Sequence, residues 1–178
     1  MTVDADSVSG VSKRRPRDRK KQIADNAAAL FAEHGFHKVR MEDIAQASGI
    51  TDRALYRHYE NKHALLAHVV NVGQAAYERA LLDGGADSGA VREGVIPDLL
   101  RGLAAAALDT RELAVLWARE ARYLPPADLA VIRERVASGA ARIVDRISDA
   151  RPDLPRPAAE LRARAVLGVL ASPSHHRR

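Results

Sequence analysis

The sequence contains no cysteine, few aromatic residues and no long hydrophobic run, and each absence excludes a class of protein. Without cysteine the chain can form neither a disulfide framework nor a thiolate metal site. Aromatic residues make up only 4% of the chain, which argues against a β-sheet protein because strands favour aromatic and β-branched side chains. No apolar segment approaches the length of a membrane span, and the N-terminus is too polar for a signal peptide. We therefore expect a cytoplasmic protein that does not enter a membrane.

The residues that are abundant favour helices and an anionic partner. Alanine, leucine and arginine dominate, and this composition predicts an all-α fold. The net charge is +5, and residues 13–21 hold seven basic side chains and one acidic one. This local charge of +6 leaves the remaining residues close to neutral. Such a basic arm is typical of phosphate binding, although a solvated tail that keeps a protein soluble has the same composition.

Apolar residues with helical spacing, together with capping and stop residues, predict about eight helices. Thr51 and Asn61 have side chains that cap helix N-termini, and Gly35 and Gly49 suit the turns after helices. The glycine-rich residues 83–89 predict a flexible loop. Pro97 predicts that a helix either starts or kinks there. The expected helical segments are residues 17–34, 41–48, a short helix after Thr51, a long helix from Asn61 to about Leu82, a segment ending at Leu108, and residues 111–124, 126–150 and 157–170.

Residues 49–62 are the most informative segment of the chain. A glycine and a capping threonine precede a short helix that is rich in arginine, tyrosine and histidine. A helix that only packs in a core has no need for so many groups able to reach phosphate, whereas a helix in a DNA groove does. The segment therefore predicts the recognition helix of a helix-turn-helix unit.

Residues 23–66 resemble the DNA-binding domain of the TetR family of transcriptional regulators. The resemblance rests on the residue pairs 30–31, 35–36, 44–45 and 49–50, on residues 55–59, and on Lys62 and Leu65. It implies a three-helix DNA-binding domain that a long fourth helix joins to a helical ligand-binding and dimerisation domain. It also implies a homodimer that binds a palindromic operator in double-stranded DNA and responds to a small, largely apolar effector.

The resemblance also implies roles for particular residues. Asp52, Arg53 and Ala54 are expected to face base edges, and Glu42 to reach a cytosine. Arg53 could instead pair with Asp52 or contact a phosphate. Arg40 stands where the family usually has serine or threonine, which predicts a lost or shifted helix cap. The residues expected to contact the DNA phosphate backbone are Arg40, Thr51, Tyr56, His58 and Lys62, with Arg14, Arg15 and Arg17 of the basic arm.

Two aromatic positions admit more than one interpretation. Tyr59 is expected to pack in the core, whereas Tyr56 is expected to face DNA because Leu55 already fills the inward position. Trp117 either lines an effector pocket or belongs only to the core. In the first case the pocket is expected to include Leu103, Leu116, Trp117, Glu120 and Tyr123.

The predicted domains are a disordered basic arm at residues 1–16, the DNA-binding domain at residues 17–66, and a ligand-binding and dimerisation domain at residues 67–178 that lacks the family's last helix. We expect no cofactor, because the histidines lack the spacing of metal ligands and no catalytic constellation or phosphate-binding loop is present. A transcriptional repressor is therefore predicted, not an enzyme. The alternative is a helical module that binds a protein or membrane surface without specific DNA binding.

Overall fold

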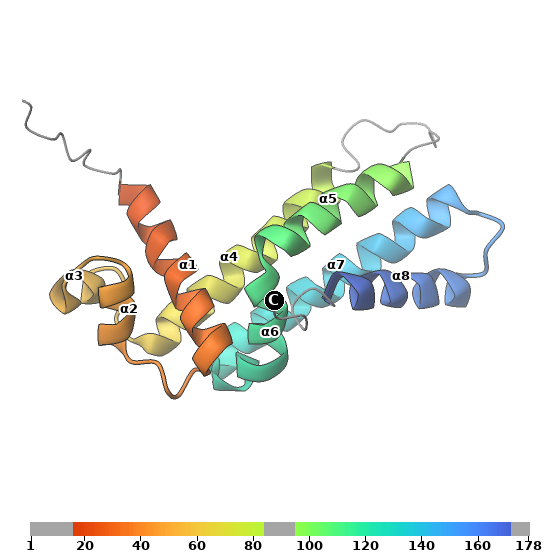
Figure 1. Cartoon of the computed structure of the whole chain (residues 1–178). Coiled ribbons are helices and arrows are strands. Elements are labelled where there is room, and N and C mark those ends of the chain that lie inside the picture. Colours follow the sequence, from red (N-terminus) through yellow and green to blue (C-terminus); the bar gives the residue numbers. More distant parts are fainter. Residues whose placement is uncertain (1–15, 84–94, 172–178) are drawn as a thin grey trace, which may run out of the picture.

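The computed structural model describes residues 16–83 and 95–171, and every regular element in these ranges is helical. Figure 1 shows α1, α2 and α3 at one end of the molecule and α5, α7 and α8 at the other, with α4 running between the two ends. None of the described helices is both long and apolar enough to span a membrane. The elements are α1 (Pro16–His34), α2 (Met41–Ala47), α3 (Asp52–Tyr56), α4 (Lys62–Asp83), α5 (Val95–Asp109), α6 (Arg111–Glu120), the 3₁₀ helix η1 (Ala121–Tyr123), α7 (Pro126–Ala150) and α8 (Arg156–Ala171).

The all-α prediction is confirmed, and most helix bounds lie within two residues of the expected ones. The largest difference concerns residues 111–124, where the α-helix ends at Glu120 and a 3₁₀ turn follows. Pro125 and Pro126 come directly after this turn and supply no backbone N–H for a continuing helix. Pro97 lies in the first turn of α5. The predicted loop at residues 83–89 lies outside the described residues from residue 84 onward.

Side-chain capping sets the start of α3 and of α4. The Thr51 hydroxyl accepts a hydrogen bond from the Ala54 N–H at 3.3 Å, and the Asn61 side chain accepts one from the Ala64 N–H at 2.9 Å. Gly49 has a φ of +62°, a left-handed conformation that glycine adopts at little cost. Thr51 and Asn61 therefore fix the start of α3 and of α4, as their sequence positions predicted.

One hydrophobic cluster joins the first three helices to α4, α6 and the start of α7. Ile23, Phe31, Ile44, Leu55 and Leu65 are fully buried in it. The same cluster includes residues of α6 and α7, so the buried core continues past residue 66. The first three helices are therefore packed directly against the part of the chain that follows them. The α6 and α7 members of the cluster are Leu113, Leu116 and Ile132.

A second cluster joins the other end of α4 to α5, α7 and α8. Its buried members include Leu81, Leu103, Ile143 and Ala159. Since α4 and α7 each contribute to both clusters, the two ends of the molecule share packing through these two helices.

An ion pair reinforces the packing of α7 on α4. The Arg135 guanidinium donates to both carboxylate oxygens of Glu78, at 2.7 and 2.8 Å, and to the Asn71 side-chain oxygen at 2.7 Å. The hydrogen bond from Arg135 lowers the pKa of Glu78 below its usual value. This two-point contact fixes the position of α7 along the middle of α4.

Candidate DNA-binding surface and effector cavity

The short helix α3 has a buried side and an exposed side. Leu55 is fully buried, and Tyr59, just after the helix, is 5% exposed. Tyr56 is 50% exposed, and Arg53, Arg57 and several neighbouring polar residues are also exposed. Leu55 and Tyr59 thus anchor the segment, as expected for both. The remaining exposed residues on it are Thr51, Asp52 and His58, while Ala54 is half-buried.

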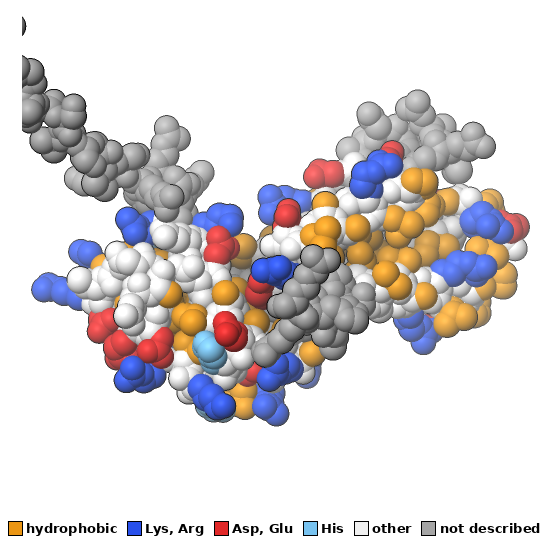
Figure 2. Space-filling view, in the orientation of Figure 1, with side chains coloured by type: hydrophobic (Ala, Val, Ile, Leu, Met, Phe, Trp, Pro, Cys, Tyr) orange, Lys and Arg blue, Asp and Glu red, His pale blue; other side chains and the backbone are white. Residues whose placement is uncertain are grey.

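The basic side chains of α3 form no ion pairs within the part of the chain that the structure describes. In particular, Asp52 and Arg53 form no ion pair or hydrogen bond with each other, although the sequence left this pairing open. Arg57, at the C-terminal cap of α3, is a further exposed cation on this surface. Sequence reasoning did not assign Arg57 a role, although the residue lies inside the basic and aromatic segment that drew attention to α3. Figure 2 shows lysine and arginine side chains distributed over this end of the molecule.

At the start of α2, where position 40 has no serine or threonine to cap the helix, an aspartate in the first turn binds the N-cap residue Arg40. The Asp43 carboxylate accepts the Arg40 backbone N–H at 2.8 Å and the Arg40 guanidinium at 3.2 Å. These backbone and side-chain hydrogen bonds hold the pKa of Asp43 below its usual value. Glu42 is exposed and lies 3.9 Å from the Arg40 guanidinium. Arg40 therefore reaches the surface already paired with two acids of its own helix.

Lys62 lies in a different environment from the other proposed phosphate contacts. Its ammonium donates to the carbonyl oxygens of Phe36 at 2.7 Å and Val39 at 2.8 Å. It also lies 4.4 Å from the centre of the Phe36 ring. Burial lowers the pKa of Lys62, and the Asp43 charge opposes this shift. Lys62 thus ties the start of α4 to the turn between α1 and α2.

The structure describes only part of the predicted basic arm. Arg14 and Arg15 lie outside the described residues, and Arg17 is the second residue of α1. Further along α1, the Arg19 guanidinium approaches the Ser48 carbonyl oxygen at 3.5 Å. The Asn26 amide donates to the Ala47 carbonyl at 3.0 Å and to the Ser48 hydroxyl at 3.1 Å. These contacts from α1 bind the C-terminal end of α2 and so orient the helix-turn-helix.

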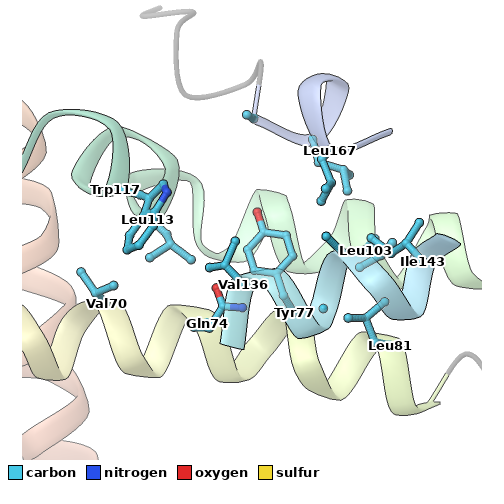
Figure 3. Close-up of a pocket in the computed structure, with 14 residues that line it drawn as sticks. Val70, Gln74, Tyr77, Leu81, Leu103, Leu113, Trp117, Val136, Ile143 and Leu167 are labelled. Atoms are coloured by element: carbon cyan, nitrogen blue, oxygen red, sulfur yellow. The ribbon is translucent and has the colours of Figure 1, made fainter. Parts of the chain in front are cut away.

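A cavity of about 150 Å³ lies between α4, α5, α6, α7 and α8, and we call it the central cavity. Figure 3 shows the α4 side chains of Gln74 and Tyr77 between two apolar groups of side chains. Val70, Leu113 and Trp117 lie at one end. The residues of the other parts of the wall are Leu81, Leu103, Val136, Gly139, Ala140, Ile143, Leu167, Leu170 and Ala171.

The central cavity includes two of the five residues proposed for an effector pocket. Leu103 and Trp117 line it, whereas Leu116, Glu120 and Tyr123 are not among its lining residues. Leu116 precedes Trp117 by one residue, so it lies about 100° around α6 and packs in the first hydrophobic cluster instead. Sequence reasoning missed Gln74 and Tyr77 of α4, which also line the cavity.

Glu120 and Tyr123 lie where α6 and η1 meet the turn after α1. The Tyr123 ring stacks on Phe36 with a centroid distance of 5.3 Å and meets His37 edge-on at 4.2 Å. Glu120 is 5% exposed, and its carboxylate oxygen lies 3.7 Å from the position that a Cβ atom on Gly35 would occupy. One end of α6 therefore contacts the turn after α1 while its middle lines the central cavity.

The first three helices and the start of α4 are similar in sequence to known proteins. The family described as bacterial regulatory proteins, tetR family, matches residues 23–69. The HTH-type transcriptional repressor KstR2 of Rhodococcus jostii (strain RHA1) is 38% identical over 66 residues, which are 37% of this chain and 30% of that repressor. The aligned part thus spans less than a third of this curated relative.

Two solved structures share the fold over most of the chain. A TetR-family transcriptional regulator from Bordetella parapertussis 12822 superposes with a TM-score of 0.73 at 18% identity, covering 89% of this chain and 83% of the other. The structure of AibR in complex with isovaleryl coenzyme A and operator DNA gives a TM-score of 0.72 at 24% identity, covering 90% of this chain and 88% of the other. The helical arrangement around the central cavity therefore has counterparts in solved structures.

Proposed function

We propose that this chain, whose residues 23–69 match the family described as bacterial regulatory proteins, tetR family, is a sequence-specific transcriptional repressor. In this proposal it binds a palindromic operator as a homodimer, and a small, largely apolar effector releases it. The observation that carries the proposal is α3, a short helix anchored by Leu55 that exposes Tyr56 and Arg53, an arginine that forms no ion pair with the described residues. The proposed activity includes no catalytic step and no cofactor, and it places the protein in the cytoplasm with the DNA.

The surface around α3 supports a division of labour between base and phosphate contacts. Arg53 lies in the first turn of α3 and is free to hold guanine through its O6 and N7 atoms. Asp52 and Ala54 complete the proposed base-reading group. The proposed phosphate contacts are Arg40, Thr51, Tyr56, His58 and the basic arm, together with Arg57. Glu42 stays a candidate for a cytosine contact and Lys62 for a phosphate contact, although both now contact groups within the protein.

A homodimer supplies the second recognition helix that a palindrome requires. Two copies of α3 are expected about 34–36 Å apart, one turn of the DNA helix. Figure 2 shows hydrophobic side chains gathered on the face of the molecule formed by its α5 and α8 end. Val131 of α7 is 54% exposed and Leu161 of α8 is 66% exposed, which leaves apolar area for a second copy. A sedimentation measurement that returns twice the chain mass of 19.3 kDa is the expected result.

The effector is proposed to act through the helices that line the central cavity and also pack on the DNA-binding helices. Both α4 and α6 meet this description, because each packs on α1 and contributes to the cavity wall. An effector that binds the DNA-incompetent arrangement a hundredfold more tightly shifts the balance by about 2.7 kcal/mol, an ordinary allosteric coupling. The two recognition helices then no longer match the spacing of the operator.

Selection from a randomised duplex pool, sequenced after binding at two salt concentrations, tests the proposal. A palindromic consensus whose binding weakens with salt is expected. Arg53→Ala is expected to relax the consensus at one base per half-site and to weaken binding by about 1–3 kcal/mol. Arg133→Ala, which removes an exposed arginine of α7, is the matched control and leaves the consensus unchanged. Binding that enriches no motif in the wild-type protein would refute the proposal.

A further inference from the structure

The central cavity contains hydrogen-bonding groups in the middle of an apolar wall. Gln74 and Tyr77 are three residues apart on α4, so their side chains lie on the same face of the helix. Figure 3 shows both between the apolar group around Trp117 and the apolar group around Leu103. We infer that the effector is an uncharged, mainly apolar molecule with one ketone or hydroxyl oxygen, which Gln74 and Tyr77 recognise. This inference rests on the proposed function, in which the central cavity is the effector site.

The absence of charge on the wall selects a neutral ligand. Among the described residues that line the central cavity, none is acidic, basic or histidine. Transferring a carboxylate from water into apolar surroundings without a cationic partner costs far more than transferring a ketone. A ligand whose carboxylate enters the cavity is therefore rejected, whereas a ketone or hydroxyl group requires only a hydrogen bond.

Gln74 provides the hydrogen bond that such an oxygen needs. Its side-chain amide is half-buried, and it forms no hydrogen bond with any other described residue. A partly buried amide without a protein partner is costly, so a ligand that supplies the partner recovers part of that cost. The amide can donate to a ketone oxygen and can both donate to and accept from a hydroxyl group.

Tyr77 lies one turn further along α4 and adds a second polar group. Burial raises the pKa of Tyr77, while a side-chain hydrogen bond with Thr110 opposes the rise. The hydroxyl group therefore stays protonated at neutral pH. The Thr110 hydroxyl already donates to the Ala106 carbonyl at 2.7 Å, so it can only accept the hydrogen bond from Tyr77. The Tyr77 hydroxyl therefore already has a protein partner before a ligand binds. Gln74 is accordingly the principal recognition residue.

The volume limits the part of the ligand that the cavity holds. About 150 Å³ equals an engineered apolar cavity that binds benzene. A single six-membered ring with a short substituent matches this size. Cyclohexyl methyl ketone, ethylcyclohexane and cyclohexanecarboxylate share one ring and differ only in the substituent, so they form a matched set of probes.

A thermodynamic cycle separates hydrogen bonding from hydrophobicity. Trp117 is the only tryptophan of the chain and lines the cavity, so its fluorescence reports binding of each probe. Gln74→Leu is expected to weaken cyclohexyl methyl ketone by about 2- to 12-fold relative to ethylcyclohexane, the loss of one hydrogen bond. Tyr77→Phe is expected to change this ratio less. The wild-type protein is expected to bind cyclohexanecarboxylate at pH 7 at least about tenfold more weakly than the ketone.

Each other outcome overturns the inference. An unchanged ratio of ketone to hydrocarbon in a folded Gln74→Leu protein removes Gln74 as the recognition residue. Equal affinity for the carboxylate and the ketone removes the requirement for a neutral ligand, and binding of none of the three probes removes the ligand site. The proposed function fails separately, because operator selection uses the protein without any probe. If the probes bind as expected but leave operator binding unchanged, effector release fails and the chemistry of the cavity stands.

Discussion

Replacing Lys62 with methionine tests whether this residue holds the fold together or binds DNA. The substitution keeps most of the apolar stem and removes the ammonium that donates to Phe36 and Val39. Both acceptors lie in the turn between α1 and α2, and both are backbone carbonyls. The ammonium also lies over the Phe36 ring, a contact that methionine retains only as a sulfur–aromatic contact.

The structure predicts a substantial loss of stability. Hydrogen bonds to a charged group each contribute roughly 1.5–3 kcal/mol, and two that share one donor group and one turn are not independent. We therefore expect Lys62→Met to lower the free energy of unfolding by about 2–3 kcal/mol. With a urea slope of about 2 kcal/mol per molar, the unfolding midpoint falls by roughly 1–1.5 M.

Urea denaturation followed by far-ultraviolet circular dichroism measures this shift. Lys38→Met is the matched control, because Lys38 is an exposed lysine of the same turn and its loss is expected to change stability by less than about 0.5 kcal/mol. The reasoning is wrong if Lys62→Met keeps the wild-type midpoint. A concurrent fall in operator affinity, with a salt dependence reduced by about one counterion, would then identify Lys62 as a phosphate contact.

Two further predictions concern stability. Arg135 depresses the folded pKa of Glu78, so the ion pair contributes fully above the usual carboxyl pKa of 4.5 and is lost as the pH falls through the lower folded value. Glu78→Gln should thus cost about 1–3 kcal/mol at pH 7 and progressively less below pH 4.5 in urea titrations, whereas a pH-independent cost would contradict the assignment. Gly49→Ala should destabilise the protein by about 1–2 kcal/mol in thermal melts, because the φ of Gly49 is +62°. Gly168→Ala in α8 should instead stabilise it by about 0.5–1 kcal/mol, because a Cβ there meets no atom within 4 Å. Equal effects of the two substitutions would rule out backbone conformation as the cause.

The first three helices and the start of α4 could be predicted closely because their signals are local. Thr51 and Asn61 cap helices through backbone groups three residues away, and Gly35 and Gly49 mark turns by their own conformation. Leu55 could be assigned to the core as the inward residue of its short helix, and Tyr59 from the resemblance to the family, and both are buried. A reader of the sequence needs no knowledge of distant contacts for any of these positions.

Contacts between distant residues escaped prediction for the opposite reason. Lys62 resembles a phosphate ligand in the sequence, and the two carbonyls that hold it precede it by 26 and 23 residues. At the start of α2, Asp43 accepts the backbone N–H of Arg40 itself, whereas a serine or threonine at position 40 would accept an N–H group from the first turn of the helix. The Lys62 contacts depend on which groups the folded turn brings within 3 Å, and spacing does not reveal this.

The central cavity was only partly predictable because cavity walls and cores use the same residue types. Leu103 and Trp117 read equally well as core residues, and an unfilled volume leaves no trace in helical periodicity. One signal was nevertheless present in α4. Val70, Gln74, Tyr77 and Leu81 recur at the spacing of a single helix face, and Gln74 stands where that face predicts an apolar residue. A glutamine without a protein partner on an inward face is costly unless something else satisfies it, so the departure from the pattern itself points to a ligand.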